Sequence, residues 1–557
     1  MQLLGGHVGN ARQHRRRARS VLVTIGVLIA VAFSLMAPVA KAATSAAGVG
    51  SQAALSAPNC DPTTKRLKLQ FYASPPCVKP WKNGDNNGGS TAQGVTKDSI
   101  KVVVLVAKDL PQQQASQGNV INQATGKPGT ERDATIDQNE VLKSVFQTWG
   151  RTVQLQFVDG TGTDEASQRA DAVKIAAMKP FAVLDFGLYG AVGGIVFRSA
   201  LAGKVPVIIS FPCCGVIAPR DVNNPVVANA AEWVGKALVG RKAKWAGDTS
   251  MQSKTRVFGV VYPGGDQGVN LALFNKQFSA YGGKAAVAVS YDFGTDPSAA
   301  AAKVQEQAPT IIAKLKSAGV TTVVNFADGT TTTPALTKAA TSQDYYPEWI
   351  VTGSGYQDID VVARLSDPKQ MAHAFGLVWF VPYVAGYQDP QVALFQWYWG
   401  TNQGTQSVGA NSLLYPLYTG VQLAGPELTG KTFEQGLVKY PPTGGAFTNQ
   451  VSTLEYSWVP FGTMPPRGSA IAWFSTDTTG PSQIVGTAAT GAGKFMYLDG
   501  AKRYVHGKFP TGEPKLFDKS NSISQLDGIP SNEKFPTYPC NNCPSSGGGP
   551  KPSASTS

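Results

Sequence analysis

Residues 256–352 decide the fold, because short apolar runs and helical patterns alternate there almost without interruption. The runs VFGVVY (257–262), AAVAVSY (285–291) and TTVVNF (321–326) have the length and composition of buried strands. Between the second and third runs, apolar residues recur on one face of a 3.6-residue helix: Val304, Ala308, Ile311, Ile312 and Leu315. Strands that alternate with helices predict crossover units and a mostly parallel sheet.

A second alternating block precedes this one and has the same character. It contains the strand-like runs IKVVVLV (100–106), FAVLDF (181–186) and VPVIIS (205–210), separated by helical segments. The chain therefore predicts two α/β blocks, at 98–232 and 253–378, followed by helices and strands that could belong to either. In such sheets ligands bind beyond the carboxyl ends of the strands, which directs attention to the loops that follow them.

Length and composition agree with a globular protein of more than one domain. The chain has 557 residues, of which 42% are hydrophobic and 15% charged. The formal net charge is +13, but six of the basic residues lie in the first 42 positions, which hold no acidic residue. The remainder is only mildly basic and shows no basic stripe with interleaved aromatic residues. We therefore do not expect a nucleic-acid-binding protein.

The first 42 residues read as a signal peptide. Five arginines precede the uncharged apolar run 21–36, and Ala40-Lys41-Ala42 has the form that precedes cleavage before Ala43. An uncleaved membrane anchor is the alternative, although the apolar run is short for a span. Either reading predicts an extracytoplasmic protein, secreted or associated with the cell surface.

Six cysteines in an exported chain suggest disulfides: Cys60, Cys77, Cys213, Cys214, Cys540 and Cys543. A local Cys60–Cys77 bridge is the simplest pairing. Cys540 and Cys543 have CxxC spacing but lie between prolines, before a Ser/Gly/Pro tail, so a small structural loop or an unpaired tail is expected there. The segment 43–97 reads as an irregular extension, and 516–557 as a disordered low-complexity tail.

Four segments resemble the type I periplasmic solute-binding proteins of ABC importers, in their branched-chain amino-acid (Leu/Ile/Val) group. They are 94–102 (GVTKDSIKV), 181–210, 256–268 (RVFGVVYPGGDQG), and 413–425 with 432–437. The resemblance spans 98–440 and leaves both ends of the chain outside. It implies two Rossmann-like lobes joined by three crossings, with ligand bound in a cleft that closes by hinge bending. It also implies an ABC permease as partner, a monomer, and no cofactor.

On this resemblance, lobe 1 comprises residues 98–232 and 380–480, and lobe 2 comprises 253–378 and 485–515. In lobe 1 the turn with Tyr189 and Gly190 opens a helix, whose free N–H groups suit a carboxylate. The next strand ends at Ser210 and leads to Cys213 and Cys214, where the family usually has small residues and a threonine. Two cysteines there place an amino-acid ligand in doubt. One reading is a strained disulfide between these two neighbouring cysteines. The other is that both are small buried thiols, or that one of them forms a disulfide with a cysteine of the tail.

In lobe 2, the predicted ligand contacts follow successive strands: Tyr262, Asp266, Asp328 and Tyr356. Either aspartate could hold an ammonium group, and the tyrosines could stack on a ligand. Aspartate is also common in turns as a capping residue, and aromatic residues at strand ends are as often part of the core.

Catalytic patterns are scarce. His373 and His506 have no metal-ligand spacing, and no GxSxG motif is present. Residues 425–432 (GPELTGKT) fit the phosphate-loop pattern, but a helical segment precedes them instead of a strand. We therefore predict a binding protein, not an enzyme, with no metal. A sensing module of the same fold, an extracytoplasmic enzyme and an adhesion protein are the alternatives, and the solute is left open.

Overall fold

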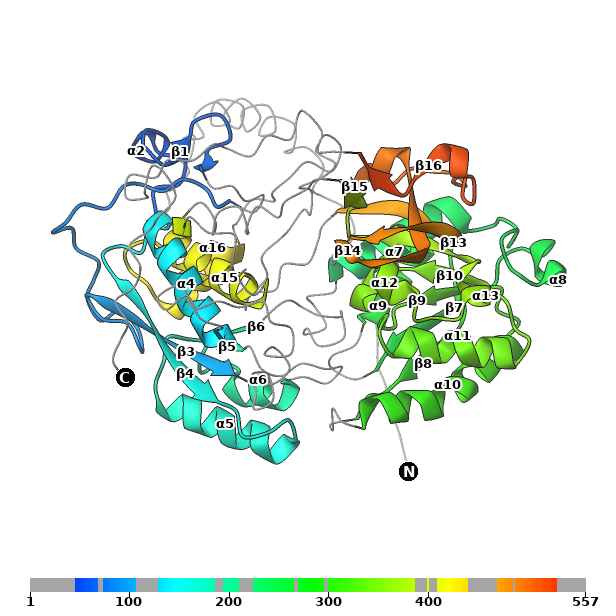
Figure 1. Cartoon of the computed structure of the whole chain (residues 1–557), viewed down its shortest axis with the longest axis horizontal. Coiled ribbons are helices and arrows are strands. Elements are labelled where there is room, and N and C mark those ends of the chain that lie inside the picture. Colours follow the sequence, from blue (N-terminus) through cyan, green and yellow to red (C-terminus); the bar gives the residue numbers. More distant parts are fainter. Residues whose placement is uncertain are drawn as a thin grey trace, which may run out of the picture. The chain divides into compact units, whose positions relative to one another are not determined.

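The computed structural model describes residues 46–68, 74–106, 129–185, 194–209, 224–264, 269–294, 299–385, 398–399, 408–438, 468–483 and 486–527. The predicted signal peptide, Cys540 and Cys543 lie outside these ranges. No helix within them is long and apolar enough to cross a membrane. Two parallel-rich sheets with helices on both faces form most of the described structure (Figure 1).

The first sheet has four parallel strands in the order β4-β3-β5-β6. Its strands and helices follow the chain as β3 (Ser99–Val106), α4 (Glu131–Val145), β4 (Thr152–Asp159), α5 (Glu165–Ala177), β5 (Ala182–Asp185), α6 (Ile195–Leu201) and β6 (Val207–Ile209). The helices α15 (Val408–Ala424) and α16 (Gly430–Val438) join this sheet from far along the chain. Because α15 is a helix, residues 425–432 follow a helix, as predicted, and lack the strand that precedes a phosphate loop.

Side chains of β3 alternate between two cores, as the pleat of a strand requires. Val102 and Val104 face a core built with α4, α15 and α16, whereas Val103 and Leu105 face one built with α5 and α6. The sheet is thus covered on both faces, which explains why its strands are almost continuously apolar.

The second sheet has nine strands. Its parallel part has the order β8-β7-β9-β10-β11, and β13, β14, β15 and β16 extend it with antiparallel pairs. The strands are β7 (Phe258–Pro263), β8 (Ala285–Tyr291), β9 (Thr322–Asn325), β10 (Glu348–Val351), β11 (Ala374–Val378), β13 (Gly468–Ser482), β14 (Gly486–Leu498), β15 (Arg503–Val505) and β16 (Ser522–Ile523).

Helices cover both faces of the second sheet. On one face α7 (Asn224–Leu238) and α9 (Leu271–Ser279) pack with Val260, Val324 and Ile350; on the other α10 (Ala300–Ser317) and α11 (Thr332–Ser342) pack with Val261, Val323 and Val351. All five predicted face residues of α10 are buried, which confirms its orientation. Shorter elements are α8 (Thr249–Gln252), η3 (Ser354–Tyr356), α12 (Asp360–Ala363), α13 (Pro368–Met371), η4 (Asp499–Ala501) and η5 (Lys519–Asn521).

The segment before β3 is tied to the first sheet. It contains α2 (Gln52–Leu55) and the short pair β1 (Cys60–Asp61) and β2 (Arg66–Leu67). The predicted Cys60–Cys77 disulfide is present, with a Cα–Cα distance of 5.6 Å. Ala47 and Val78 of this segment pack with Trp149 in a buried cluster, and the Gln422 amide of α15 donates to the Pro76 carbonyl. The extension is therefore largely irregular but packed against α15.

Three predicted boundaries are wrong. The first block was predicted to end at 232, but helix α7 (Asn224–Leu238) runs through that position, and its apolar residues pack with the second sheet. Strand β13, assigned to lobe 1 up to residue 480, pairs with β11. The tail was predicted to begin at 516, but β16 and β17 (Gln525–Leu526) continue the sheets to residue 526, the latter by pairing with β12 (Tyr383–Val384).

The chain passes three times between the two sheets and their cores. It leaves the first sheet after β6 for α7, leaves the second after β11 for α15, and returns after α16 to β13. Two Rossmann-like units joined by three passages are the α/β architecture predicted from the sequence.

Candidate functional site

Strand order places the candidate site at the carboxyl ends of the parallel strands. Numbered by their order along the chain, the parallel strands follow the sequence 2-1-3-4 in the first sheet and 2-1-3-4-5 in the second. In doubly wound sheets of this kind, ligands bind outside the carboxyl ends, near the point where the strand order reverses. That point lies between β3 and β5 in the first sheet and between β7 and β9 in the second.

In the first sheet, the predicted contacts follow β5 and β6. Tyr189, Gly190, Ser210, Cys213 and Cys214 lie outside the described residues, as does Asp266 of the second sheet. These six positions stay predictions. The described part of the candidate site is thus the carboxyl edge of the second sheet, which we define as the residues that end β7, β9, β10 and β11 and those that immediately follow them.

Two of the predicted tyrosines are half-buried at this edge. Tyr262 is near the end of β7, and Tyr356 closes the short helix η3 after β10. The Tyr356 ring lies 6.0 Å from the ring of Phe380, centroid to centroid, and is tilted by 51°. Phe380 was not predicted from the sequence, because it lies beyond residue 378, where the second block was predicted to end. Half-exposed aromatic rings of this kind offer a surface on which a planar or apolar solute part can stack.

Asp328 has a structural role that accounts for its carboxylate. It is 1% exposed, and it accepts hydrogen bonds from the backbone N–H groups of Thr330, Thr331 and Thr332 and from two of their hydroxyls. A carboxylate that accepts N–H groups at the first turn of a helix stabilises that turn. The capping alternative therefore describes Asp328 in this structure, and contact with a ligand ammonium stays a prediction.

Buried amides and hydroxyls tie the loops after β9 and β10 together. The Thr352 hydroxyl and the Gln357 amide both donate to the Asn325 carbonyl, at 2.8 and 3.1 Å. Gln357 Oε1 accepts the Thr352 N–H at 3.2 Å, and Asn325 Nδ2 donates to the Thr333 hydroxyl at 3.0 Å. Buried polar groups that satisfy one another in this way fix loop conformation. The loop that carries Tyr356 is thereby held to the neighbouring strand.

Two glycines permit close approach in the same loop. Gly353 has φ +79°, and a Cβ there would lie 2.4 Å from Trp379 Nε1. Gly355 has φ +56°, and a Cβ there would lie 2.5 Å from the Cα of Asp328. Other residues at these positions would meet both backbone strain and a clash. The turn before Tyr356 therefore requires glycine, and it packs directly against the loops after β9 and β11.

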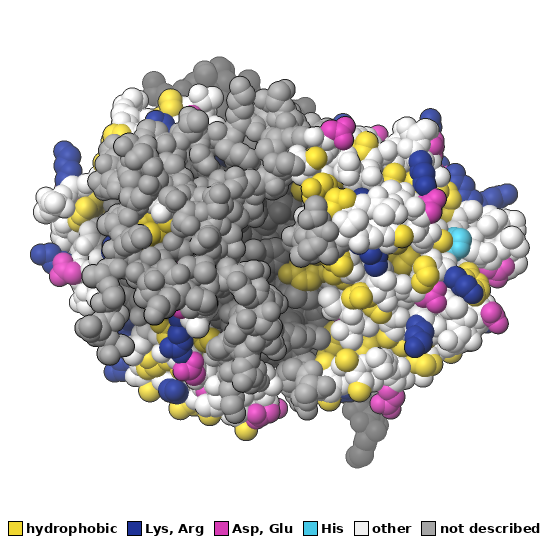
Figure 2. All heavy atoms as spheres, in the orientation of Figure 1, with side chains coloured by type: hydrophobic (Ala, Val, Ile, Leu, Met, Phe, Trp, Pro, Cys, Tyr) yellow, Lys and Arg dark blue, Asp and Glu magenta, His cyan; other side chains and the backbone are white. Residues whose placement is uncertain are grey.

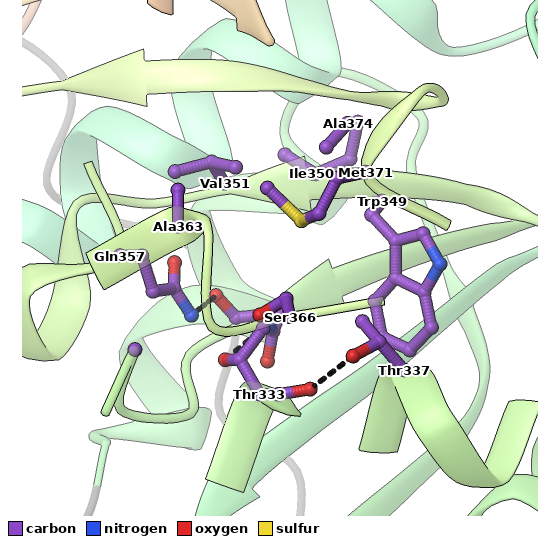
Figure 3. A pocket seen from close by; sticks show the side chains of 12 residues that line it. Thr333, Thr337, Trp349, Ile350, Val351, Gln357, Ala363, Ser366, Met371 and Ala374 are labelled. Carbon is purple, nitrogen blue, oxygen red and sulfur yellow. Dashed lines mark hydrogen bonds between the residues drawn. The ribbon is translucent and has the colours of Figure 1, made fainter. Parts of the chain in front are cut away.

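A small cavity lies behind these loops, between β10 and the helices α11 to α13 (Figure 3). Thr333, Thr337, Gln357 and Ser366 supply its polar wall, and Trp349 and Met371 its apolar wall. It has room for about one water molecule, too little for an organic solute. This cavity belongs to the support of the loops and is not a candidate solute site.

The described carboxyl edge presents aromatic rings, amides and hydroxyls, and its buried carboxylates, Asp328 and Asp358, accept backbone N–H groups. The described residues include no group of three or more His, Cys, Asp or Glu side chains that could hold a metal ion. On the face seen in Figure 2, the Lys and Arg side chains of the described residues are scattered among Asp and Glu.

The architecture belongs to the class of two-unit α/β proteins in which three chain passages join two doubly wound sheets. Neither a protein-family model nor a curated protein sequence matches the chain. Solved structures do, at low identity.

One match is described as a putative branched-chain amino-acid ABC transporter protein from Rhodospirillum rubrum. It is 14% identical, with a TM-score of 0.40, over 67% of this chain and 97% of that one. Another is a leucine-, isoleucine-, valine-, threonine- and alanine-binding protein from Brucella ovis in a closed conformation. It is 11% identical, with a TM-score of 0.43, over 77% of this chain and 100% of that one. A third is an ABC transporter solute-binding protein from Rhodopseudomonas palustris in complex with 3,4-dihydroxybenzoic acid. It is 13% identical, with a TM-score of 0.41, over 74% of this chain and 99% of that one. Likeness at this level does not define a ligand for this chain.

Proposed function

We propose that this protein is an extracytoplasmic solute-binding protein, which captures a small polar solute between its two lobes and presents it to an ABC permease. The observation that carries the proposal is the three-passage topology, because each lobe then offers the carboxyl edge of a parallel sheet. Solute contacts made with both lobes would shift the population toward a closed form. The sequence-derived export signal and the Cys60–Cys77 disulfide agree with a location outside the cytoplasm.

The described carboxyl edge favours a solute with a planar or apolar part. Tyr262, Tyr356 and Phe380 are half-buried there, and the Asp328 carboxylate is occupied by its own helix. From lobe 1 we propose contacts by Tyr189, Gly190, Ser210, Cys213 and Cys214, and from lobe 2 by Asp266. Leucine-like amino acids and hydroxybenzoate-like acids, the ligand types named for similar structures, are both suitable first probes.

The direct test is a thermal-shift screen of purified residues 43–557 against amino acids, amides, polyamines and aromatic carboxylates. A solute that binds only the native state raises its stability by RT ln(1 + [L]/Kd), about 2.7 kcal/mol at a hundredfold excess over Kd. A hit without turnover supports the proposal. A folded protein that responds to no member of the panel, or that converts a hit into product, contradicts it in favour of an adhesion protein or an enzyme.

A further inference from the structure

Four backbone groups at the start of the second passage are all held by side chains. Trp379 and Phe380 follow directly after β11, on the path from the second sheet to α15. Their two N–H groups donate to Asp358 Oδ2, at 2.5 and 3.1 Å. The Trp379 carbonyl accepts from Arg503 Nη1 at 2.5 Å, and the Phe380 carbonyl accepts from the Tyr497 hydroxyl at 2.9 Å.

The three side chains that form this clamp come from three separate elements. Asp358 follows η3, Tyr497 is in β14, and Arg503 begins β15. All are buried, at 0 to 1% exposure. Placing a carboxylate and a guanidinium in the interior is costly unless they form strong hydrogen bonds. Backbone groups at the end of a strand could instead have been left to water, so this arrangement indicates a segment whose conformation matters.

Arg503 also connects the second passage with the third. Its Nη2 donates to the carbonyl of Gly468, the first residue of β13, to which the chain returns from α16. One guanidinium therefore holds the residue at which the chain leaves the second sheet and the residue at which it comes back.

The clamp is continuous with the candidate site. Asp358 lies two residues after Tyr356, and the Phe380 ring is the one that packs against the Tyr356 ring. Gly353, in the same turn, lies directly against the Trp379 indole. The clamp thus determines where one of the two aromatic rings of this pair lies relative to the other.

We propose that Asp358, Tyr497 and Arg503 are positioning residues for solute binding, which fix the Trp379–Phe380 segment and thereby hold the Phe380 ring against Tyr356. This inference rests on the proposed function for its consequence, but the clamp itself is testable without any solute. Its strength depends on the charge of Asp358, because an ionised carboxylate is a stronger acceptor than a protonated one.

Asp358 is the group whose titration changes the clamp. Burial raises its pKa to about 6, and its hydrogen bonds to Trp379 and Phe380 and the Arg503 charge oppose that rise. Its Oδ1 has no hydrogen-bond partner among the described residues. The other titratable or charged groups near it are Tyr497, whose pKa burial raises well above its usual value, and the buried pair Asp360–Lys494. The Asp358→Asn variant separates the titration of Asp358 from that of Asp360, because it leaves Asp360 unchanged.

The experiment follows the indole of Trp379 in the full chain as the pH falls from 8 to 5. The signal of Trp379 is the tryptophan emission of the wild type minus that of Trp379→Phe. The same subtraction is made between Asp358→Asn and the double variant Asp358→Asn/Trp379→Phe. We expect a transition near pH 6 in the wild-type background that is absent with Asp358→Asn and retained with Asp367→Asn, a capping aspartate elsewhere. An indole signal at pH 8 that is the same in the wild type and Asp358→Ala, or the same pH transition with Asp358→Asn, would overturn the clamp.

The second arm tests positioning with L-leucine or 4-hydroxybenzoate, whichever raises the melting temperature of the wild type. Asp358→Asn keeps an acceptor oxygen, whereas Asp358→Ala leaves two N–H groups without one. We expect Asp358→Ala to weaken binding by about tenfold or more at pH 7.5, and Asp358→Asn to restore most of it. Equal affinities for all three proteins would contradict a positioning role. If neither probe binds the wild type, the proposed function fails while the emission experiment still decides the clamp.

Discussion

The amino and carboxyl edges of the second sheet differ in what they leave exposed. At the amino edge, Arg256 and Glu348 are 0% exposed at the side chain and form a bidentate pair at 2.7 and 2.9 Å. Glu513 and the Trp245 ring complete the surroundings of Arg256. At the carboxyl edge, amides and hydroxyls tie the loops after β9 and β10, the buried Asp358 and Arg503 hold the segment after β11, and aromatic rings are left half-exposed. A closed, fully paired charge cluster supports the fold, whereas open rings on fixed loops are suited to meeting a solute.

The largest expected effect is at the amino edge. Arg256→Ala would leave Glu348 buried without its charge partner, which typically costs about 3–5 kcal/mol of unfolding free energy. Urea denaturation measures it. The control is Lys303→Ala, whose partner Asp292 is exposed, for which we expect less than about 1 kcal/mol. Equal losses for both variants would remove the distinction between a buried structural pair and a surface pair.

The next effect is a pH dependence at the carboxyl edge. The pKa of Asp358 is about 6 in the folded protein and ordinarily about 3.9 in an unfolded chain. The folded state therefore binds more protons between these values, and the contribution of Asp358, fully present below pH 4, is lost as the pH rises through 6. Its size is on the order of 3 kcal/mol.

Unfolding free energies of the wild type and Asp358→Asn, measured from pH 4 to 7, test this sign. We expect the wild type to lose stability relative to the variant as the pH rises. Parallel curves, or a difference of opposite slope, would show that Asp358 titrates normally.

A smaller effect, on solute affinity, should distinguish the two ends of strand β10. Tyr356 follows β10 and Tyr346 precedes it, and both are half-buried. Tyr356→Ala should weaken binding of a solute found in the screen by about 1–2 kcal/mol, roughly tenfold, because it removes a ring from the binding surface. Tyr346→Ala should leave the affinity unchanged. Isothermal titration measures both, and equal losses would indicate general destabilisation instead of a local contact.

The smallest effect concerns loop fixation. Thr352→Val removes the hydroxyl that donates to the Asn325 carbonyl and should cost about 1 kcal/mol in unfolding free energy. Thr352→Ser retains the hydroxyl and should recover most of that loss. If valine is tolerated as well as serine, the tie between the loops after β9 and β10 contributes nothing measurable.

Much of the fold was predictable because alternation and helical periodicity are local signals. The run 285–291 coincides with β8, and the spaced apolar residues from Val304 to Leu315 are those that α10 buries. The block boundary predicted at 232 falls inside α7, although Asn224-Pro225 is a helix-start signal. The hairpin of β13 and β14 was missed, because its second half is rich in Gly, Ala and Thr and shows little alternation.

The candidate site was less predictable, because its decisive contacts join residues far apart in the sequence. Tyr262 and Tyr356 were predicted from their place at the ends of strands, and their contact with a solute stays a prediction. Asp328 was expected among the ligand contacts or the caps, and only its hydrogen bonds distinguish the two roles. Arg503 and Tyr497 carry no local signal at all, since their partners Trp379 and Phe380 lie more than 110 positions away.

The most direct test of the central claim is hydrogen–deuterium exchange of the full chain, with and without a solute that raises its melting temperature. We expect slower exchange at residues 352–358 and 379–381, on the carboxyl edge, and unchanged exchange at 241–257, on the amino edge. Protection confined to the amino edge, or none at either edge while the solute is bound, would contradict the assignment of the carboxyl edge as the solute-binding surface.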